Sequence, residues 1–349
     1  MTAELIIAVD AMGGDHAPHM VVDGLKIAQE RFPRVKFLLF GDEQALKPLF
    51  DHAPKLISVC EIVHAPEVVS NEAKPSQVLR TGRKTSMWQA IDSVAKGDAG
   101  GVVSAGNTGA LMAVSKFVLR PLPGIARPAI AGFVPTEKGS SIMLDLGANI
   151  ECDAQNLVQF ALMGEVFARI AFGNQKPSLG VLNVGSEELK GNSAVKEACA
   201  ILKEFDSINF HGFIEGTDIC AGTVDVIVTD GFSGNIALKT AEGVGKLFVG
   251  FLKQSFNSSL MAKLGYLLSR SALNQVKNKI DPRRYNGAMF LGLNGVAVKS
   301  HGGTDHVGFA YAVGAAIDLV GGNLNERIKE EFAKIPQMPS NGQENGGSE

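Results

Sequence analysis

Six short apolar stretches in this 349-residue chain each run into a loop rich in Gly, Asn, Asp, Ser or Lys. Strands buried on both faces of an α/β sheet are apolar throughout, so each stretch is predicted to be a strand. The loops then follow the carboxyl ends of strands, where open α/β sheets bind their ligands. Several loops lead into helical patterns, whose first backbone amides bind anions. The stretches with their loops are residues 8–15, 102–110, 143–149, 181–192, 228–235 and 298–303. Together they predict one large site for an anionic ligand.

Strand and helix patterns alternate along the chain, which predicts an α/β three-layer sandwich with a large, mostly parallel sheet. The expected strands are residues 5–10, 35–40, 57–63, 100–104, 129–134, 141–145, 178–183, 224–229, 289–293 and 296–299. The expected helices are residues 18–31, 42–51, 84–96, 107–119, 153–172, 192–205, 233–256, 259–279, 305–321 and 324–334. We expect one α/β lobe from residues 1–135 plus 285–335 and a second from residues 136–284.

One region departs from this alternation, because residues 243–280 keep a helical period with no strand after them. Leu260, Leu264 and Leu267 lie on one apolar stripe, and a break at 257–259 predicts a helical pair that projects from the sheet. Six cations between residues 263 and 284 face a single acid: Lys263, Arg270, Lys277, Lys279, Arg283 and Arg284. A basic amphipathic helix suits an anionic membrane surface or an acidic partner, and an arm in a dimer interface gives the same pattern.

Composition narrows the classes of protein. The formal net charge of −3 argues against nucleic-acid binding. Cys60, Cys152, Cys199 and Cys220 have neither zinc-site nor disulfide-framework spacing and are expected to be idle thiols of a reducing compartment. No signal peptide and no membrane-spanning stretch are recognised, so we expect a cytoplasmic protein. The polar, Gly-rich residues 336–349 are expected to be a disordered tail.

The sequence lacks the familiar cofactor and hydrolase motifs. It has no G-x-G-x-x-G for a Rossmann nicotinamide site and no G-x-x-x-x-G-K-[ST] for a nucleotide. It also has neither H-E-x-x-H nor G-x-S-x-G. We therefore expect an anion-handling site that needs no cofactor.

The loops supply the chemical groups that such a site needs. Lys190, beside Gly191 and Asn192 at a helix start, can hold a phosphate by its charge while the amides hold it by geometry. Apart from Lys299 it is the only cation in the six loops. Neutral donors for a phosphate or a developing oxyanion are Asn107, Thr108, Ser233 and Asn235, each of which can instead be a helix cap.

Four acids stand at strand ends, namely Asp10, Asp15, Asp145 and Asp230. They can orient the lysine and the amides, act as a base or hold magnesium, and these alternatives stay open, although we favour a site without a metal. His301 and His16 are the loop histidines placed for proton transfer.

These loops also carry a resemblance. The stretch V-D-A-M-G-G-D-H-A-P at 9–18 resembles the opening signature of the phosphate acyltransferase family of bacterial phospholipid synthesis. The resemblance continues in order to about residue 335, although residues 80–87 depart from it. It runs through P-S-Q-V-L-R (75–80), S-A-G-N-T-G-A-L-M (104–112), L-D-L-G-A-N (144–149), K-G-N (190–192), D-G-F-S-G-N (230–235), Y-N-G-A (285–288) and K-S-H-G (299–302).

The resemblance implies acyl transfer from an acyl-[acyl carrier protein] to inorganic phosphate, giving an acyl phosphate for phosphatidic acid synthesis. It implies a fold like those of phosphotransacetylases and the isocitrate and isopropylmalate dehydrogenases. It further implies a homodimer with peripheral membrane contact, which hands acyl phosphate to a glycerol-3-phosphate acyltransferase. Neither cofactor nor metal is implied.

On this hypothesis the catalytic residues are Lys190, Asn107, Asn235, Asp145, Asp230 and His301. The expected phosphate- or substrate-binding residues are Asp10, Gly13, Gly14, Asp15, Ser104, Gly106, Thr108, Gly147, Asn149, Gly191, Asn192, Ser233 and Gly234. Contact with a partner or a membrane is expected at Leu260, Leu264, Leu267, Lys263, Arg270, Lys277, Arg283 and Arg284. Since no Cys or Ser lies in an activating motif, we expect direct transfer without an acyl-enzyme.

Three other interpretations remain open. A phosphotransacetylase acting on acyl-CoA would use the same loops. A non-catalytic membrane scaffold would need only the basic helical pair. An isopropylmalate-type dehydrogenase is disfavoured because the nicotinamide motif is missing.

Overall fold

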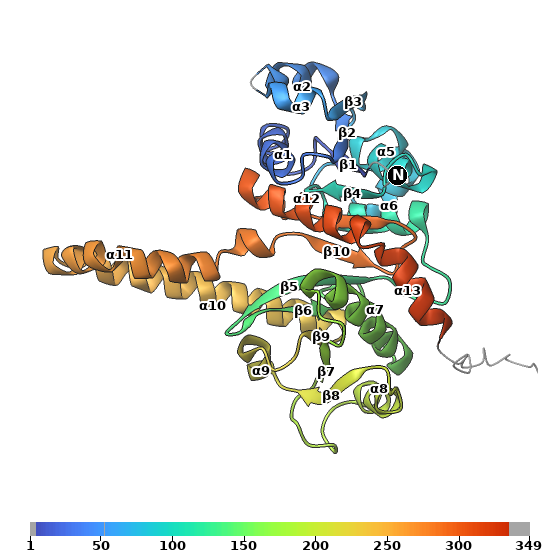
Figure 1. Cartoon of the computed structure of the whole chain (residues 1–349), viewed down its shortest axis with the longest axis vertical. Coiled ribbons are helices and arrows are strands. Elements are labelled where there is room, and N and C mark those ends of the chain that lie inside the picture. The colour runs from blue at the N-terminus through green and yellow to red at the C-terminus, as the bar shows by residue number, and fades with distance from the viewer. Residues whose placement is uncertain (1–4, 52, 335–349) are drawn as a thin grey trace, which may run out of the picture.

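The computed structural model describes residues 5–51 and 53–334, so the expected tail at 336–349 lies outside the described residues. One 11-stranded sheet carries helices on both faces (Figure 1), in the order β3-β2-β1-β4-β11-β10-β5-β6-β9-β7-β8. The strands are β1 (Ile6–Asp10), β2 (Lys36–Gly41), β3 (Cys60–His64), β4 (Gly101–Ser104), β5 (Ala129–Thr136), β6 (Gly139–Leu144), β7 (Ser178–Leu182), β8 (Asn209–Ile214), β9 (Val226–Val228), β10 (Ala288–Leu291) and β11 (Val296–Lys299).

Helices fill most of the connections between strands. They are α1 (His19–Arg31), α2 (Glu43–Phe50), α3 (Pro54–Ile57), α4 (Pro75–Thr81), α5 (Ser86–Lys96), α6 (Thr108–Leu119), α7 (Ala154–Phe172), α8 (Ser193–Lys203), α9 (Gly216–Ala221), α10 (Gly231–Asn257), α11 (Leu260–Lys279), α12 (His306–Gly321) and α13 (Leu324–Ala333), with short 3-10 turns at Gly82–Lys84 and Pro282–Tyr285. The expected α/β sandwich is confirmed.

Strand direction reverses in the middle of the sheet. Strands β3, β2, β1, β4 and β11 are mutually parallel, and we call them the β1 half. Strands β6, β9, β7 and β8 are also mutually parallel, and we call them the β6 half. Between the halves, β10 is antiparallel to β11, β5 to β10, and β6 to β5. The two halves therefore run in opposite directions.

Alternation along each strand sends side chains into two layers. In β1, Ile7 and Val9 join the large cluster under α1, α7, α8, α12 and α13, whereas Ala8 joins the cluster under α5 and α6. In β6, Met143 packs on the same side as Leu238 of α10. Both sheet faces are thus buried near its centre, which is why the central strands are mostly apolar.

The expected helical pair is present and projects from the sheet (Figure 1) as α10 and α11, with its turn at Ser258 and Ser259. No residue of α11 is buried, and in α10 only Gly231 and Gly234 are. The α10–α11 pair therefore gains little stability from packing against the hydrophobic core.

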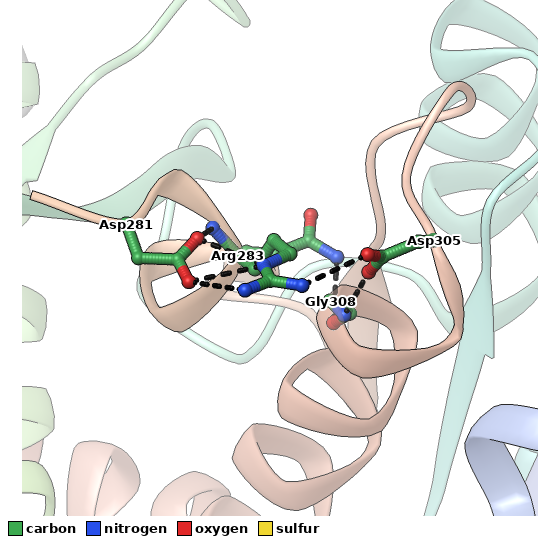
Figure 2. Close-up of polar contacts among 5 residues, drawn as sticks. Asp281, Arg283, Asp305 and Gly308 are labelled. Atoms are coloured by element: carbon green, nitrogen blue, oxygen red, sulfur yellow. Dashed lines mark hydrogen bonds and ion pairs between the residues drawn. The ribbon is translucent and has the colours of Figure 1, made fainter. Parts of the chain in front are cut away.

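An ion-pair cluster lies at the base of this pair (Figure 2). The Arg283 guanidinium donates to both carboxylate oxygens of Asp281, with Nη2 to Oδ2 at 2.7 Å, and its Nη1 donates to Oδ2 of Asp305 at 3.0 Å. Asp305 also caps α12 by accepting from the Gly308 amide at 2.9 Å. Arg283 is thus committed to joining the chain after α11 to the start of α12.

The sequence missed several elements. Strand β8 and the short helices α3, α4 and α9 were not expected, because their side chains are only partly buried and their apolar patterns are short. The expected lobe boundary near residue 135 falls in the β5–β6 hairpin, where Thr136 pairs with Gly139. The sheet is hydrogen-bonded across that boundary, and the division into lobes stays a prediction.

Candidate active site

The six loops form two groups instead of one. Those after β1, β4 and β11 lie together on the β1 half, and those after β6, β9 and β7 lie together on the β6 half. Strands β10 and β5 separate the groups, and among the described residues no hydrogen bond or ion pair joins them. The expectation that all six loops line one hollow does not take account of the reversal in strand direction.

A buried aspartate organises the β1-half loops. Oδ1 of Asp10 accepts from the Ser86 hydroxyl and Oδ2 from the Ser104 hydroxyl, each at 2.7 Å. The Met12 amide adds a longer bond to Oδ1 at 3.3 Å. Burial raises the pKa of Asp10, and the two hydroxyls oppose that rise. Asp10 therefore connects three segments that are far apart in the sequence.

The β1-half loops pack too closely for side chains at some positions. A Cβ on Gly13 would collide with Oδ2 of Asp10 and lie 2.7 Å from the Gly106 amide nitrogen. The Asp15 amide donates to the Gly302 carbonyl at 2.9 Å, which ties the loop after β1 to the loop after β11. The side chain of Asp15 is exposed and accepts from Nδ2 of Asn71 at 3.1 Å.

The Asn107 side chain caps α6 and holds the segment of residues 70–73 in place. Its Oδ1 accepts from the Ala110 amide at 3.0 Å, and its Nδ2 donates to the carbonyls of Ser70, Asn71 and Ala73 at 3.3, 2.9 and 3.1 Å. Every polar atom of the side chain is in use, so the geometry favours a positioning role over the expected direct contact. Thr108, at the start of α6, is exposed.

His301 has an exposed imidazole whose Nδ1 accepts from the Gly303 amide at 3.2 Å. Its own amide donates to Oδ1 of Asn286 at 2.9 Å, and Nδ2 of Asn286 donates to the Ser300 hydroxyl at 2.8 Å. Asn286 thus holds this loop in place. Sequence reasoning did not select Asn286, although it lies in the Y-N-G-A motif.

Lys299, the last residue of β11, was likewise noted but not selected. Its Nζ donates to the carbonyls of Ala105, at 3.4 Å, and Ser300. Burial lowers the pKa of Lys299 to about 8, and the charges of Asp15 and Asp10 limit the fall. Its position at the carboxyl end of a buried strand is the sequence feature that could have identified Lys299 as a site residue.

A second buried aspartate organises the β6 half through main-chain donors. Oδ1 of Asp145 accepts from the amides of Ile130, Gly147 and Ala148 at 2.9, 3.2 and 3.1 Å. Its Oδ2 accepts from the amide and Nδ2 of Asn149 at 2.6 and 2.9 Å. Burial raises the pKa of Asp145, and these donors oppose that rise. Asp145 therefore fixes the loop that follows β6.

Helix α10 begins against that loop. Asp230 caps it, with Oδ1 accepting from the Ser233 amide at 2.7 Å and Oδ2 from the Ser233 hydroxyl at 3.0 Å. A Cβ on Gly234 would collide with the Asp145 carbonyl oxygen, so only glycine allows this approach. Asn235 follows, exposed, and its Cβ lies 3.6 Å from the position of a Cβ on Gly147. The site's exposed amide thus sits beside the Asp145 loop.

Lys190 lies in the loop after β7, the strand paired with β9. Its Nζ forms an ion pair with Glu187 at 2.7 Å, its side chain is 50% exposed, and the hydrogen bond to Glu187 raises the pKa of Lys190. Asn192 caps α8 by accepting from the Val195 amide at 2.9 Å. Since β7 and β9 are parallel neighbours, the Lys190 loop and the start of α10 leave the same end of the sheet.

A cavity of about 430 Å³ adjoins the β6-half loops, between the first turns of α7 and α8. Its lining residues include Arg127, Glu151, Cys152, Asp153, Ser193 and Glu197. Its lining is mostly polar and charged, and it includes Ser193, the first residue of α8.

The four candidate acids are divided two and two between the halves. In residues 5–51 and 53–334 no group of three or more His, Cys, Asp and Glu side chains is arranged to hold a metal ion. Burial raises the pKa of Cys60, Cys152 and Cys199 to about 12, which disfavours the reactive thiolate.

Comparison with known proteins agrees with this architecture. A profile of the family described as fatty acid synthesis protein matches residues 5–327. A phosphate acyltransferase from Paramagnetospirillum magneticum is 63% identical over 336 residues, covering 96% of each chain. One from Rhodospirillum centenum is 61% identical, covering 96% of this chain and 95% of its own. A Streptococcus pyogenes phosphotransacetylase structure is 16% identical with a TM-score of 0.63, covering 92% of this chain and 95% of its own.

The fold is therefore the α/β fold of the phosphotransacetylase structures, with polar loops at the carboxyl ends of strands in each half. At the sequence level the chain belongs to the phosphate acyltransferase family, and it is an acyltransferase. In the described part of the chain, no single helix is long and apolar enough to cross a membrane; α12 and α13 pass that test only together, as a pair bent by 49°.

Proposed function

We propose that this enzyme transfers the acyl group of an acyl-[acyl carrier protein] to inorganic phosphate, forming an acyl phosphate for phospholipid synthesis. The observation that carries this proposal is identity above 60% with phosphate acyltransferases over nearly the whole chain. A glycerol-3-phosphate acyltransferase would consume the product.

This reaction depends more on positioning the two substrates than on a strong general base. Phosphate is already an anionic nucleophile near neutral pH, so the enzyme must align it with the thioester carbonyl and stabilise the oxyanion. Alignment contributes about 7–11 kcal/mol in well-oriented systems. One oxyanion-hole donor contributes about 2.7–4 kcal/mol.

The β6-half loops offer the groups for both tasks. Lys190 is charged and half exposed, and a solvent-exposed ion pair such as its contact with Glu187 contributes little to stability, so a phosphate can displace Glu187. Asn235 and Ser233 lie in the first turns of α10, whose amides add a positive field. We assign the phosphate to Lys190 with the Gly191 and Asn192 amides, and the oxyanion to Asn235. Ser233 donates both its amide and its hydroxyl hydrogen to Asp230, so it positions the start of α10.

The proposal is tested by trapping the acyl phosphate with hydroxylamine after mixing purified protein, acyl-carrier thioester and phosphate. We expect product from the wild type and a loss of roughly 100-fold in kcat/KM for Lys190→Ala. The matched control is Lys203→Ala, because Lys203 is 53% exposed and pairs with Glu188 at 2.8 Å in the same way. Equal activity of the two variants would contradict the role of Lys190, and absence of acyl phosphate from the wild type would contradict the function.

A second candidate substrate is acyl-CoA, which the likeness to phosphotransacetylase structures favours. The same assay with matched acyl chains on CoA and on carrier protein separates the two. A higher kcat/KM for the carrier thioester supports our proposal, and a higher value for acyl-CoA supports the alternative.

We further propose that the α10–α11 pair is the contact surface for a second copy of the chain and for an anionic membrane. Leu260, Leu264 and Leu267 are 84%, 50% and 61% exposed, which is costly for apolar side chains left in water. Exposed apolar residues continue down α10 toward the active site at Leu247, Val244, Ile236 and Phe232. Lys263, Arg270 and Lys277 add positive charge for lipid or for an acidic carrier protein, whereas Arg283 is engaged at the base.

This surface is tested with Leu264→Glu/Leu267→Glu against Ser269→Glu, an exposed position on the same helix. Light scattering reports the oligomeric state, and co-sedimentation with anionic and neutral vesicles reports membrane contact. We expect the double variant to become monomeric or to stop co-sedimenting with anionic vesicles. We expect Ser269→Glu to show neither change. Unchanged behaviour of both would contradict the proposal.

A further inference from the structure

Lys299 occupies a position that the reaction described above does not use. It ends β11 in register with Ser104 of β4, so it stands between the loops that follow the two strands. Exposed Asp15, Asn71 and His301 form the surface of the same loop cluster, while Lys299 itself is only partly exposed. The partly buried ammonium group thus belongs to the same loop cluster as these exposed polar side chains.

The bonding of Lys299 leaves its charge without an ion-pair partner. Its Nζ donates to the carbonyls of Ala105 and Ser300, and in the described chain no carboxylate oxygen lies within 4.0 Å of it. The nearby acids are engaged elsewhere, since Asp10 accepts from two serine hydroxyls and Asp15 accepts from Asn71. A cation removed from water without a counter-ion is unfavourable, and an anionic ligand would relieve that cost.

The loop beside Lys299 has two glycines that the fold itself does not require. Neither Gly302 nor Gly303 has a left-handed φ. A Cβ on Gly302 would meet no atom nearer than 3.4 Å, and one on Gly303 none nearer than 3.3 Å. This contrasts with Gly13, where a side chain would collide with Asp10. Glycine here keeps the main chain accessible, as loops that hold phosphoryl groups do.

We propose that Lys299, with the main-chain amide of Gly302, binds a phosphoryl oxyanion of one of the two substrates. The inference rests on the proposed function, in which inorganic phosphate and the phosphodiester of the carrier's prosthetic arm are both such groups. Lys190 and Lys299 then supply one cation to each half of the sheet.

The electrostatics around Lys299 agree with this geometry. Burial lowers the pKa of Lys299 to about 8, while Asp15 and Asp10 act in the opposite direction. A bound oxyanion would act in the same direction as these two aspartates: it would raise the pKa of Lys299 and keep the lysine charged at neutral pH. The other titratable groups of the loop after β11 are His301, which is exposed, and Asp305, which is paired with Arg283.

The test compares Lys299→Met and Lys299→Arg with wild type in two arms, one varying inorganic phosphate and the other varying acyl-carrier thioester. We expect Lys299→Met to raise KM at least tenfold in one arm, which identifies the source of the oxyanion, with a smaller change in kcat. Lys299→Arg should recover part of the loss. The matched control is Lys116→Met, an exposed lysine of α6 in the same half.

Unchanged KM values in both arms, in a Lys299→Met protein with wild-type melting temperature, would overturn the proposal. If Lys299→Met fails to fold, Gly303→Ala provides the second test, because its Cβ crowds the ligand path and not the core. Direct binding of inorganic phosphate and of non-acylated carrier protein, measured by calorimetry on wild type and variants, needs no turnover. It therefore separates failure of this site from failure of the proposed reaction.

Discussion

The two halves of the sheet each end in a buried aspartate, yet the two carboxylates are held by different kinds of donor. Asp10 is held mainly by the hydroxyls of Ser86 and Ser104, which can rotate and can also accept a hydrogen bond. Asp145 is held by four main-chain amides and the Asn149 side chain, and those amides can only donate. The β1 half thus has an adjustable centre and the β6 half a fixed one.

This difference assigns different tasks to the two halves. A fixed carboxylate keeps the loop after β6 and the start of α10 in one geometry, which suits the alignment of reacting groups. An adjustable centre beside the unpaired Lys299 suits a loop cluster that accepts a ligand and adapts to it. The same substitution in the two halves therefore has unequal consequences.

The largest effect is expected for Asp145→Asn. An asparagine NH₂ placed at either oxygen position would face amide donors, and each buried donor left unpaired costs about 1–3 kcal/mol. We expect the free energy of unfolding to fall by about 3 kcal/mol or more, measured by urea denaturation. Asp98→Asn, at an exposed position, is the control. A loss below about 1 kcal/mol would show that the Asp145 loop is less rigid than its hydrogen bonds indicate.

A smaller loss is expected for Asp10→Asn. The carboxamide oxygen keeps one serine donor, and the other hydroxyl turns to accept from the new NH₂. Because burial raises the pKa of Asp10, the neutral side chain also avoids the cost of burying a charge. We expect a loss of about 1 kcal/mol by the same urea measurement. A loss equal to that of Asp145→Asn would remove the distinction between the halves.

The smallest effect is expected at the base of the helical pair, where the carboxylates are partly solvated. The hydrogen bond from Arg283 lowers the pKa of Asp281, so this interaction stabilises the fold above the unfolded pKa of about 3.9 and is lost as pH falls through the lower folded value. Arg283→Gln should cost about 1 kcal/mol or less at pH 7, and the difference from wild type should shrink as the pH falls through the lowered pKa of Asp281. Melting temperatures of both proteins as the pH is lowered from 7 measure it. A difference that does not shrink as the pH falls would mean that Arg283 acts through packing.

Hydrophobic pattern predicted most of the architecture. Strand β4 is buried throughout and β1 is buried after Ile6, and a period of two or 3.6 over a buried face leaves a clear signal. The projecting pair was predicted because two apolar stripes had no strand after them, and the exposed leucines of α11 confirm it. Strand β8 was missed because it is only partly buried, which weakens the signal.

The arrangement of the site was less accessible to sequence reasoning. A loop motif gives the residues at a strand end but not the direction in which that strand runs, and direction depends on pairings such as β5 with β6. The loops were therefore expected around one hollow, whereas the structure divides them. The hydrogen-bond partners of the site side chains could not be predicted from the sequence either, because they depend on tertiary contacts. Examples are the bonds of Asn107 to the carbonyls of residues 70–73 and the lack of a carboxylate partner for Lys299 among the described residues.

The continuous sheet has a mechanical consequence. From β3 to β8 each strand is hydrogen-bonded to the next, so the molecule has no seam along which two rigid bodies can part. Any motion that draws the Lys190 side and the Lys299 side toward each other must twist or bend the ladder around β10 and β5. The catalytic cycle would then depend on elastic bending of the sheet, not on rotation about a hinge. Shortening the β5–β6 hairpin would change the bending stiffness of the sheet without changing any residue of the six loops.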